Sequence, residues 1–70
     1  MNIILNGNHW KTDEKTMFNR ISYESIVTMA GYYPGDVLTV TYSSKDHDGS
    51  LINGQHCKLS EGMIFNVFNT

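Results

Sequence analysis

Apolar and other residues alternate at the start of the chain, and this period of two predicts a β-strand. The face expected to be buried carries Met1, Ile3 and Leu5. Residues 6–8, Asn-Gly-Asn, readily adopt the positive φ values of a tight hairpin turn. We therefore expect residues 9 to about 16 to return antiparallel to the first strand, as an exposed edge strand with Trp10 as its main apolar contact.

The last segment, residues 63–69, is the one around which we expect the fold to be organised. It is rich in β-branched and aromatic residues and contains neither Pro nor Gly, which favours a strand over a helix. One face carries Met63, Phe65 and Val67, and the other carries Ile64, Asn66 and Phe68. Because neither face is purely polar, we expect this strand to lie inside a sheet rather than at its edge.

A short helix is predicted to start after Ser22. Ser22 is a good N-cap, Ile21 occupies the position of a hydrophobic staple, and Glu24 places negative charge in the first turn. The apolar stripe consists of Tyr23, Ile26, Val27 and Ala30. Gly31 is positioned to end the helix. A helix of about nine residues is unstable alone, so we expect its stripe to pack on a sheet.

The segments between these elements complete the expected fold. Residues 16–20 either end the second strand or lead into the helix, with Phe18 as the expected buried residue. Residues 37–43 predict a strand, with Leu38, Val40 and Tyr42 toward the helix. Residues 45–49 predict a polar loop, and residues 55–59 a short extended piece. The order of elements describes a single α+β domain, a mixed sheet of about four to five strands with one helix packed on one face.

Composition and charge narrow the class of protein. The 70 residues correspond to one small domain, and their formal net charge of −2 offers no electrostatic footprint for nucleic acid. Cys57 is the only cysteine, so an intramolecular disulfide is excluded, which suits a reducing compartment. The sequence has no secretory leader pattern and no apolar run of about 18 residues. We therefore expect a cytoplasmic protein without a membrane segment.

Candidate catalytic and metal-binding groups are weak in this sequence. His56 and Cys57 are neighbours, but neighbouring residues of a strand project to opposite faces, so we expect Cys57 to be a buried thiol rather than a nucleophile. Residues 46–48, Asp-His-Asp, lack the separated ligand spacing of a zinc or calcium site, so a solvated turn is the simpler interpretation. We expect no enzyme activity, no cofactor and no metal.

The remaining candidate is a binding surface. If the buried faces of the strands pack under the helix, Ile4, Ile64 and Phe68 emerge on the opposite side of the sheet. Exposed apolar groups mark a docking site when they are contiguous. The alternative is that a loop or a second copy of the chain covers them. The residues by themselves therefore indicate a small binding module.

Three blocks in the second half of the chain stand out. They are residues 33–42 (Tyr-Pro-Gly-Asp-Val-Leu-Thr-Val-Thr-Tyr), 49–55 (Gly-Ser-Leu-Ile-Asn-Gly-Gln) and 61–67 (Glu-Gly-Met-Ile-Phe-Asn-Val). Together with the helix start at residues 21–27, they resemble the bacterial multiubiquitin family of ubiquitin-like proteins. The resemblance covers nearly the whole chain, and residues 62–67 are its most specific part. It implies the ubiquitin-like β-grasp fold, which agrees with the predicted order of elements.

This resemblance implies a role as a protein modifier. Such proteins are encoded in bacteria beside a ubiquitin-activating-like enzyme, a conjugating-like enzyme and a JAB-type metalloprotease, in operons associated with conjugation and antiphage defence. The implied mechanism adenylates the C-terminal carboxylate, captures it as a thioester on an enzyme cysteine, and passes it to an amine of a target protein. The chain then supplies its C-terminal tail, Asn69 and Thr70, as the substrate.

The C-terminal residues leave three functions open. Ubiquitin-like modifiers end in Gly or Gly-Gly several residues past the last strand, because glycine threads a narrow active-site channel without a side-chain clash. This sequence ends with Asn69-Thr70 instead. The alternatives are a protein modifier, a non-conjugated interaction or assembly module, and a sulfur carrier. The association of copies into an oligomer is open as well.

Overall fold

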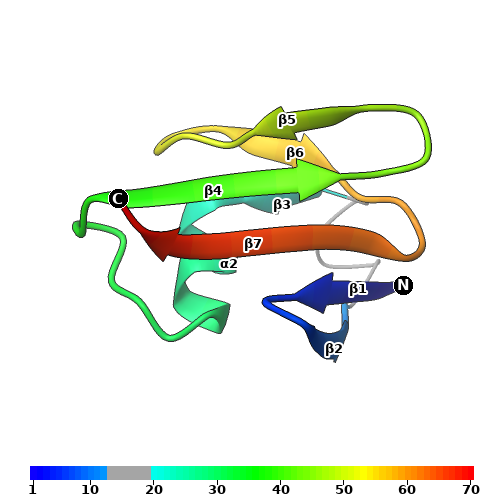
Figure 1. The fold of residues 1–70 in the computed structure, drawn as a ribbon, viewed down its shortest axis with the longest axis horizontal. Coiled ribbons are helices and arrows are strands. Elements are labelled where there is room, and N and C mark those ends of the chain that lie inside the picture. Colours follow the sequence, from blue (N-terminus) through cyan, green and yellow to red (C-terminus); the bar gives the residue numbers. More distant parts are fainter. Residues whose placement is uncertain (13–19) are drawn as a thin grey trace.

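A five-stranded sheet forms the centre of the molecule. The computed structural model describes residues 1–12 and 20–70. Across the sheet the strands are β2 (Asn8–Lys11), β1 (Asn2–Leu5), β7 (Met63–Asn69), β4 (Leu38–Ser43) and β5 (Asp48–Ser50). The helix α2 (Tyr23–Met29) packs behind β7 and β4 in Figure 1. A two-stranded ribbon of β3 (Arg20–Ser22) and β6 (His56–Lys58) lies on the same side. The expected α+β, ubiquitin-like β-grasp fold is confirmed.

The central strand of the sheet is β7, as its two partly apolar faces predicted. It runs parallel to β1, with Ile3 opposite Met63. On its other side it runs antiparallel to β4, with Val40 opposite Val67. β1 pairs with residues 63–65 and β4 with residues 64–69, so the first half of β7 has hydrogen-bonded neighbours on both sides, which allows its apolar side chains to be buried with a paired backbone.

The start of α2 is capped as predicted. The backbone of Ser22 is extended, and its Oγ accepts a hydrogen bond from Ser25 N at 3.1 Å. The helix has 7 residues rather than about nine, because Ala30 is already its C-cap and Gly31 follows with a φ of 90°. In the described part of the chain, no helix has the length and apolar character required to cross a bilayer.

The core lies between α2 and one face of the sheet. The predicted core residues that are buried are Ile3, Leu5, Val40, Met63, Phe65 and Val67. Met1 and Leu38, expected with them, are only partly buried and pack at the edge of the core. Leu51 and Leu59 complete the core from the segments around β6. Each large apolar side chain buried in this way stabilises the fold by about 1.5–3 kcal/mol.

Two segments expected to be irregular are strands. Asp48 and Gly49 were placed in a polar loop, but they belong to β5, which pairs antiparallel with the end of β4. Arg20 was expected either to end the second strand or to lead into the helix, but residues 20–22 pair with β6 as β3, and Ser22 also caps the helix as predicted. The loop prediction for Asp48 and Gly49 was wrong and β3 was not predicted, because strands this short show little periodicity of their own, so their pairing partner decides their conformation.

The edge strand β2 is shorter than expected within the described residues. It runs from Asn8 to Lys11 and pairs antiparallel with β1. Residues 13–16 of the expected strand, and Phe18 with its expected burial, lie outside the described residues. Trp10 is opposite Ile3 on the core side but remains 39% exposed, so it covers the edge of the core rather than filling it.

Candidate partner-binding surface

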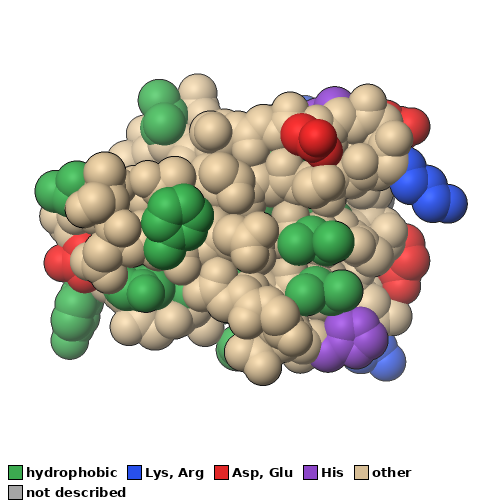
Figure 2. All heavy atoms as spheres, in the orientation of Figure 1, with side chains coloured by type: hydrophobic (Ala, Val, Ile, Leu, Met, Phe, Trp, Pro, Cys, Tyr) green, Lys and Arg blue, Asp and Glu red, His purple; other side chains and the backbone are tan. Residues whose placement is uncertain are grey.

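The outer face of the main sheet is the face turned away from α2. Along β7, buried residues alternate with Ile64, Asn66 and Phe68, which are exposed. Directly opposed residues of neighbouring strands share a face, so Ile4 of β1 and Thr41 of β4 belong to the outer face as well. Figure 2 shows the molecule from this side.

Ile4 and Ile64 form an adjacent apolar pair on the outer face. The parallel register of β1 and β7 places them side by side, and neighbouring strands are about 4.8 Å apart. Ile64 is 41% exposed and Ile4 is half-buried. His9 flanks the pair on β2, and Ser43 flanks it on β4. Two of the three predicted binding residues therefore form one apolar spot.

Phe68, the third predicted residue, lies apart from this pair. An extended strand rises about 3.3 Å per residue, so Phe68 is roughly 13 Å along β7 from Ile64, with Asn66 between them. Phe68 is 48% exposed and is opposite Thr39. Figure 2 shows hydrophobic side chains in two groups, one over β1 and β7 and one near the C-terminal end of the sheet. The predicted residues thus make two apolar spots separated by polar side chains.

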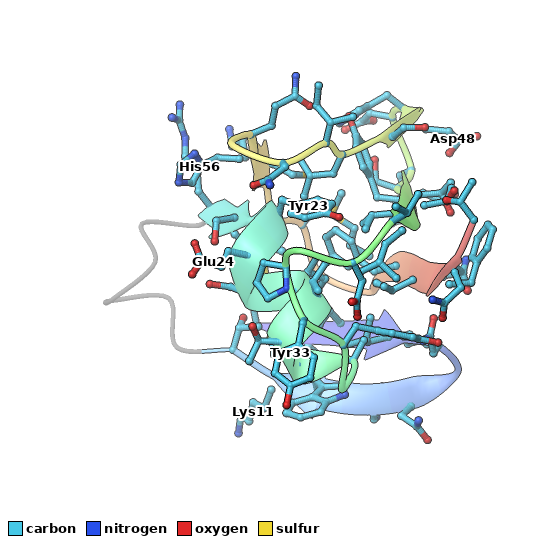
Figure 3. The ribbon with its side chains drawn as sticks, turned by 90° about the vertical axis from the view of Figure 1, so that its left-hand side faces the viewer. Lys11, Tyr23, Glu24, Tyr33, Asp48 and His56 are labelled. Carbon is cyan, nitrogen blue, oxygen red and sulfur yellow. The ribbon has the colours of Figure 1, made fainter. Side chains whose placement is uncertain are left out.

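The spot at Phe68 includes Val37, which was not among the predicted site residues, and Tyr33 is a further exposed aromatic residue on the loop before β4. Val37 is 75% exposed, and its carbonyl oxygen accepts a hydrogen bond from Thr70 N at 3.1 Å, so it lies diagonally across from Phe68. Tyr33 is 79% exposed and projects from the loop between α2 and β4 (Figure 3). The signal for Val37 was present in the sequence, because alternation places it on the same face as Thr39.

The predicted tail residues, Asn69 and Thr70, continue from this second spot. Asn69 ends β7 opposite Leu38. Thr70 is held against β4 by the bond to Val37 and by a contact of 2.8 Å between its Oγ1 and that of Thr39. Both tail residues are exposed. The structure therefore holds them in line with the sheet while leaving their side chains accessible.

Cys57 is buried, as predicted, and His56 is not its partner. Cys57 is 6% exposed and lies opposite Ile21 on the inner side of the ribbon, whereas His56 is exposed on the other side. Burial raises the pKa of the Cys57 thiol, which keeps it protonated at neutral pH. This position therefore has no activated nucleophile.

The Asp-His-Asp segment forms a turn and then enters β5. Ser44 Oγ accepts a hydrogen bond from His47 N at 3.2 Å and donates one to His47 O at 2.9 Å. Ser43 Oγ donates to Asp48 Oδ1 at 2.8 Å, and the His47 ring meets Tyr42 edge-on with 5.6 Å between ring centroids. Within residues 1–12 and 20–70, no group of three or more His, Cys, Asp and Glu side chains is arranged to hold a metal ion.

Comparison with known proteins establishes the family. Searches of curated proteins and of solved structures found no match. The sequence profile of the Multiubiquitin family matches residues 1–70, which is the whole chain. The strand order and the central position of β7 agree with that match. The chain therefore belongs to the Multiubiquitin family of ubiquitin-like proteins.

Proposed function

We propose that this chain is a bacterial ubiquitin-like protein modifier. An activating enzyme adenylates its C-terminal carboxylate with ATP and releases pyrophosphate. A cysteine thiolate of that enzyme then displaces AMP to form a thioester, and an amine of the target protein displaces the thiol to leave an amide bond. In this scheme the chain is the substrate, and the nucleophiles belong to the enzymes. Its membership of the Multiubiquitin family supports the proposal.

The single observation that carries this proposal is the continuity of the central strand with the C-terminal residues. Asn69 is the last residue of β7 and Thr70 follows it, and β7 is paired with β4 up to Asn69 and with β1 at residues 63–65. A segment attached to the middle of a sheet has a defined orientation relative to the outer face. An enzyme that docks on Ile64 and Phe68 therefore finds the C-terminal residues at a reproducible distance from its active site, which is the condition for efficient acyl transfer.

The outer face has the composition of a reversible docking surface. Its two apolar spots are separated by the uncharged side chains of Asn66 and Thr41, and Thr39 flanks Phe68. Apolar centres with a polar, uncharged surround are typical of non-obligate interfaces. We propose that this face binds the activating-like enzyme, the conjugating-like enzyme and the JAB-type metalloprotease. We propose that these interactions serve antiphage defence in the bacterial cytoplasm.

A thioester assay tests the proposal. The native-length protein is first isolated from its own cells, and its intact mass defines its C-terminus. It is then incubated with the activating enzyme encoded beside its gene, ATP and Mg²⁺. We expect a covalent enzyme adduct that dithiothreitol releases, and no such adduct when the catalytic cysteine of the enzyme is replaced by Ala. Absence of a reducible adduct with the intact enzyme rejects conjugation.

A non-conjugated interaction or assembly module is the second candidate, and the position of Thr70 favours it. Because Thr70 is hydrogen-bonded to Val37 and Thr39, the chain at this point has to leave β4 before it can extend into an enzyme channel. A module that only binds needs no such release. Stable binding to the enzymes without an adduct supports this candidate. A sulfur carrier is distinguished by its intact mass, because its C-terminus becomes a thiocarboxylate in which one sulfur replaces one carboxylate oxygen.

A further inference from the structure

The ribbon of β3 and β6 has an inner side and an outer side. Ile21 and Cys57 are directly opposed and point into the core, where they are 1% and 6% exposed. Because side chains alternate along a strand, the residues before and after them point away from the core. These outward residues are Arg20, Ser22, His56 and Lys58.

Arg20 and Lys58 are like charges in directly opposed positions. Side chains in such positions have Cβ atoms about 4.5–5.5 Å apart, and like charges there repel. Neither residue forms an ion pair with another residue of the described chain, and both are exposed. The protein has 5 Lys and Arg residues and a net charge of −2, so this pair reverses the overall charge locally. An anion placed between the two side chains would remove the repulsion.

His56 extends this basic side toward a small pocket. The pocket has a volume of about 220 Å³, and its lining includes Glu24 and Gln55 as well as His56. Figure 3 shows His56 and Glu24 on the same side of the molecule, at the start of α2. The surface thus changes from basic at Arg20 and Lys58 to mixed polar at the pocket, over the length of the ribbon.

We propose that the outer side of the β3–β6 ribbon binds an acidic segment of a partner protein, with a carboxylate between Arg20 and Lys58. The guanidinium of Arg20 can bind a carboxylate through two parallel hydrogen bonds, and Lys58 adds a second charge from the opposite strand. The peptide backbone next to this carboxylate lies along His56 toward the pocket, where the side chain of Gln55 offers a hydrogen-bond donor and an acceptor.

Nucleic acid fits this surface less well than an acidic peptide. Each strand of the ribbon has 3 residues, and its outward side chains include the small ring of His56 but no Phe, Tyr or Trp ring on which a base could stack. Two permanent cations are few for tracking a phosphate backbone. A single carboxylate, in contrast, can be bound by the two cations of Arg20 and Lys58 alone.

The ribbon is separate from the outer face of the main sheet. In Figure 1, β3 and β6 lie behind β4 and β5, on the side of α2. The spots at Ile64 and Phe68 face the opposite way. An acidic segment can therefore bind the ribbon while another partner occupies the outer face, and this inference holds whether or not the C-terminus is conjugated.

An NMR titration and a fluorescence titration test this inference. The probe is a short fluorescein-labelled peptide of alternating Glu and Gly, compared with a Gln–Gly peptide and with single-stranded oligothymidine. We expect the Glu–Gly peptide to shift the backbone amide signals of residues 20–22 and 56–58 selectively. The Arg20→Gln/Lys58→Gln double variant is expected to weaken its binding by roughly tenfold, because two charge-assisted bonds are lost.

A charge-matched control decides whether the effect is local. The Lys11→Gln/Lys45→Gln double variant removes the same charge from exposed positions on other strands and loops, so it should change the affinity by less than about twofold. Repulsion between Arg20 and Lys58 also predicts that Lys58→Gln melts at the same or a higher temperature than the parent protein without peptide. Equal weakening by the two double variants, or tighter binding of oligothymidine than of the peptide, overturns the inference.

Discussion

The side-chain amide of Asn6 forms two hydrogen bonds with the backbone of Val67. Asn6 Nδ2 donates to Val67 O at 3.0 Å, and Asn6 Oδ1 accepts from Val67 N at 2.8 Å. Asn6 has a φ of 49°, so the backbone turns into the β1–β2 hairpin at this point. The amide therefore takes the place of the next strand residue and continues the hydrogen-bond ladder along β7.

Replacing Asn6 separates the two roles of this residue. Asn6→Gly keeps the positive φ without strain but loses both amide bonds, and we expect it to lower the free energy of unfolding by about 1–3 kcal/mol. Asn6→Ala loses the same bonds and keeps a Cβ in the left-handed region without the polar side chain that lets Asn tolerate it, so we expect it to be about 1 kcal/mol less stable than Asn6→Gly. Urea unfolding measures both. Asn8→Ala in the same hairpin is the control, and a Gly variant as stable as the parent would contradict this role.

Phe65 and Phe68 offer a matched pair on one strand. Phe65 is 0% exposed in the middle of the core, and Phe68 is 48% exposed on the outer face. Phe65→Ala should cost about 3–5 kcal/mol, a large share of the stability of a small domain. Phe68→Ala should cost less than about 1 kcal/mol. Thermal unfolding followed by circular dichroism distinguishes them, and similar losses at the two positions would show that the assigned faces of β7 are wrong.

Gly49 leaves room for the ring of Tyr42. A Cβ at Gly49 would lie 2.6 Å from the Tyr42 hydroxyl oxygen and 2.8 Å from Cζ, and the Tyr42 ring also packs against Phe65 at 6.3 Å between centroids. We expect Gly49→Ala to destabilise the protein by about 1–3 kcal/mol through overpacking. Gly35→Ala, where an added Cβ meets no atom within 4 Å, is the control. The loss at Gly49 should shrink in a Tyr42→Ala background, and an undiminished loss there would assign it to the backbone instead.

Glu61 makes stability depend on pH. Its carboxylate accepts hydrogen bonds from Asn2 N at 2.9 Å and Asn2 Nδ2 at 2.8 Å, and these bonds lower the pKa of Glu61 below its ordinary value of 4.5. Because the pKa of Glu61 is lower in the folded state, its charged form stabilises the fold at pH values above its ordinary pKa. This contribution to stability is lost as the pH falls through the lowered pKa. The parent protein should therefore be more stable than Glu61→Gln at pH 7.

Chemical denaturation of both proteins across a pH series measures this difference. We expect the gap between the parent and Glu61→Gln to close as the pH falls below about 4.5. Glu24→Gln removes the same charge from the first turn of α2 and controls for a general effect of net charge. A gap between the parent and Glu61→Gln that stays constant from neutral to acidic pH would rule out the proposed linkage.

The two apolar spots of the outer face should matter for binding but not for folding. Replacing Ile64 and Phe68 with Ser removes exposed apolar groups, so we expect affinity for the activating-like enzyme to fall by about tenfold or more while the unfolding midpoint changes little. Isothermal titration calorimetry measures the affinity. Ile52→Ser, at a residue that is 61% exposed but belongs to the loop before β6, is the matched control. Unchanged affinity of the double variant would remove the outer face from the interface.

Local signals in the sequence were sufficient for the long, regular elements. The cap at Ser22 and the alternation along residues 63–69 depend on neighbouring residues, so they identified α2 and the central strand. The same alternation placed Ile64 and Phe68 on one face. It did not reveal that they belong to two separate spots, because the distance between side chains depends on which strands lie beside β7 and in what register.

The sequence by itself determined which side chains turn inward and which turn outward along β1, β4 and β7, because alternation along a strand is a local property of the backbone. Only the tertiary structure decided that Asn6 replaces a strand residue beside Val67 and that Arg20 faces Lys58 across a ribbon. These residues are 61 and 38 positions apart along the chain, respectively. No local pattern specifies such pairs, since they exist only once hydrophobic burial has brought distant segments together.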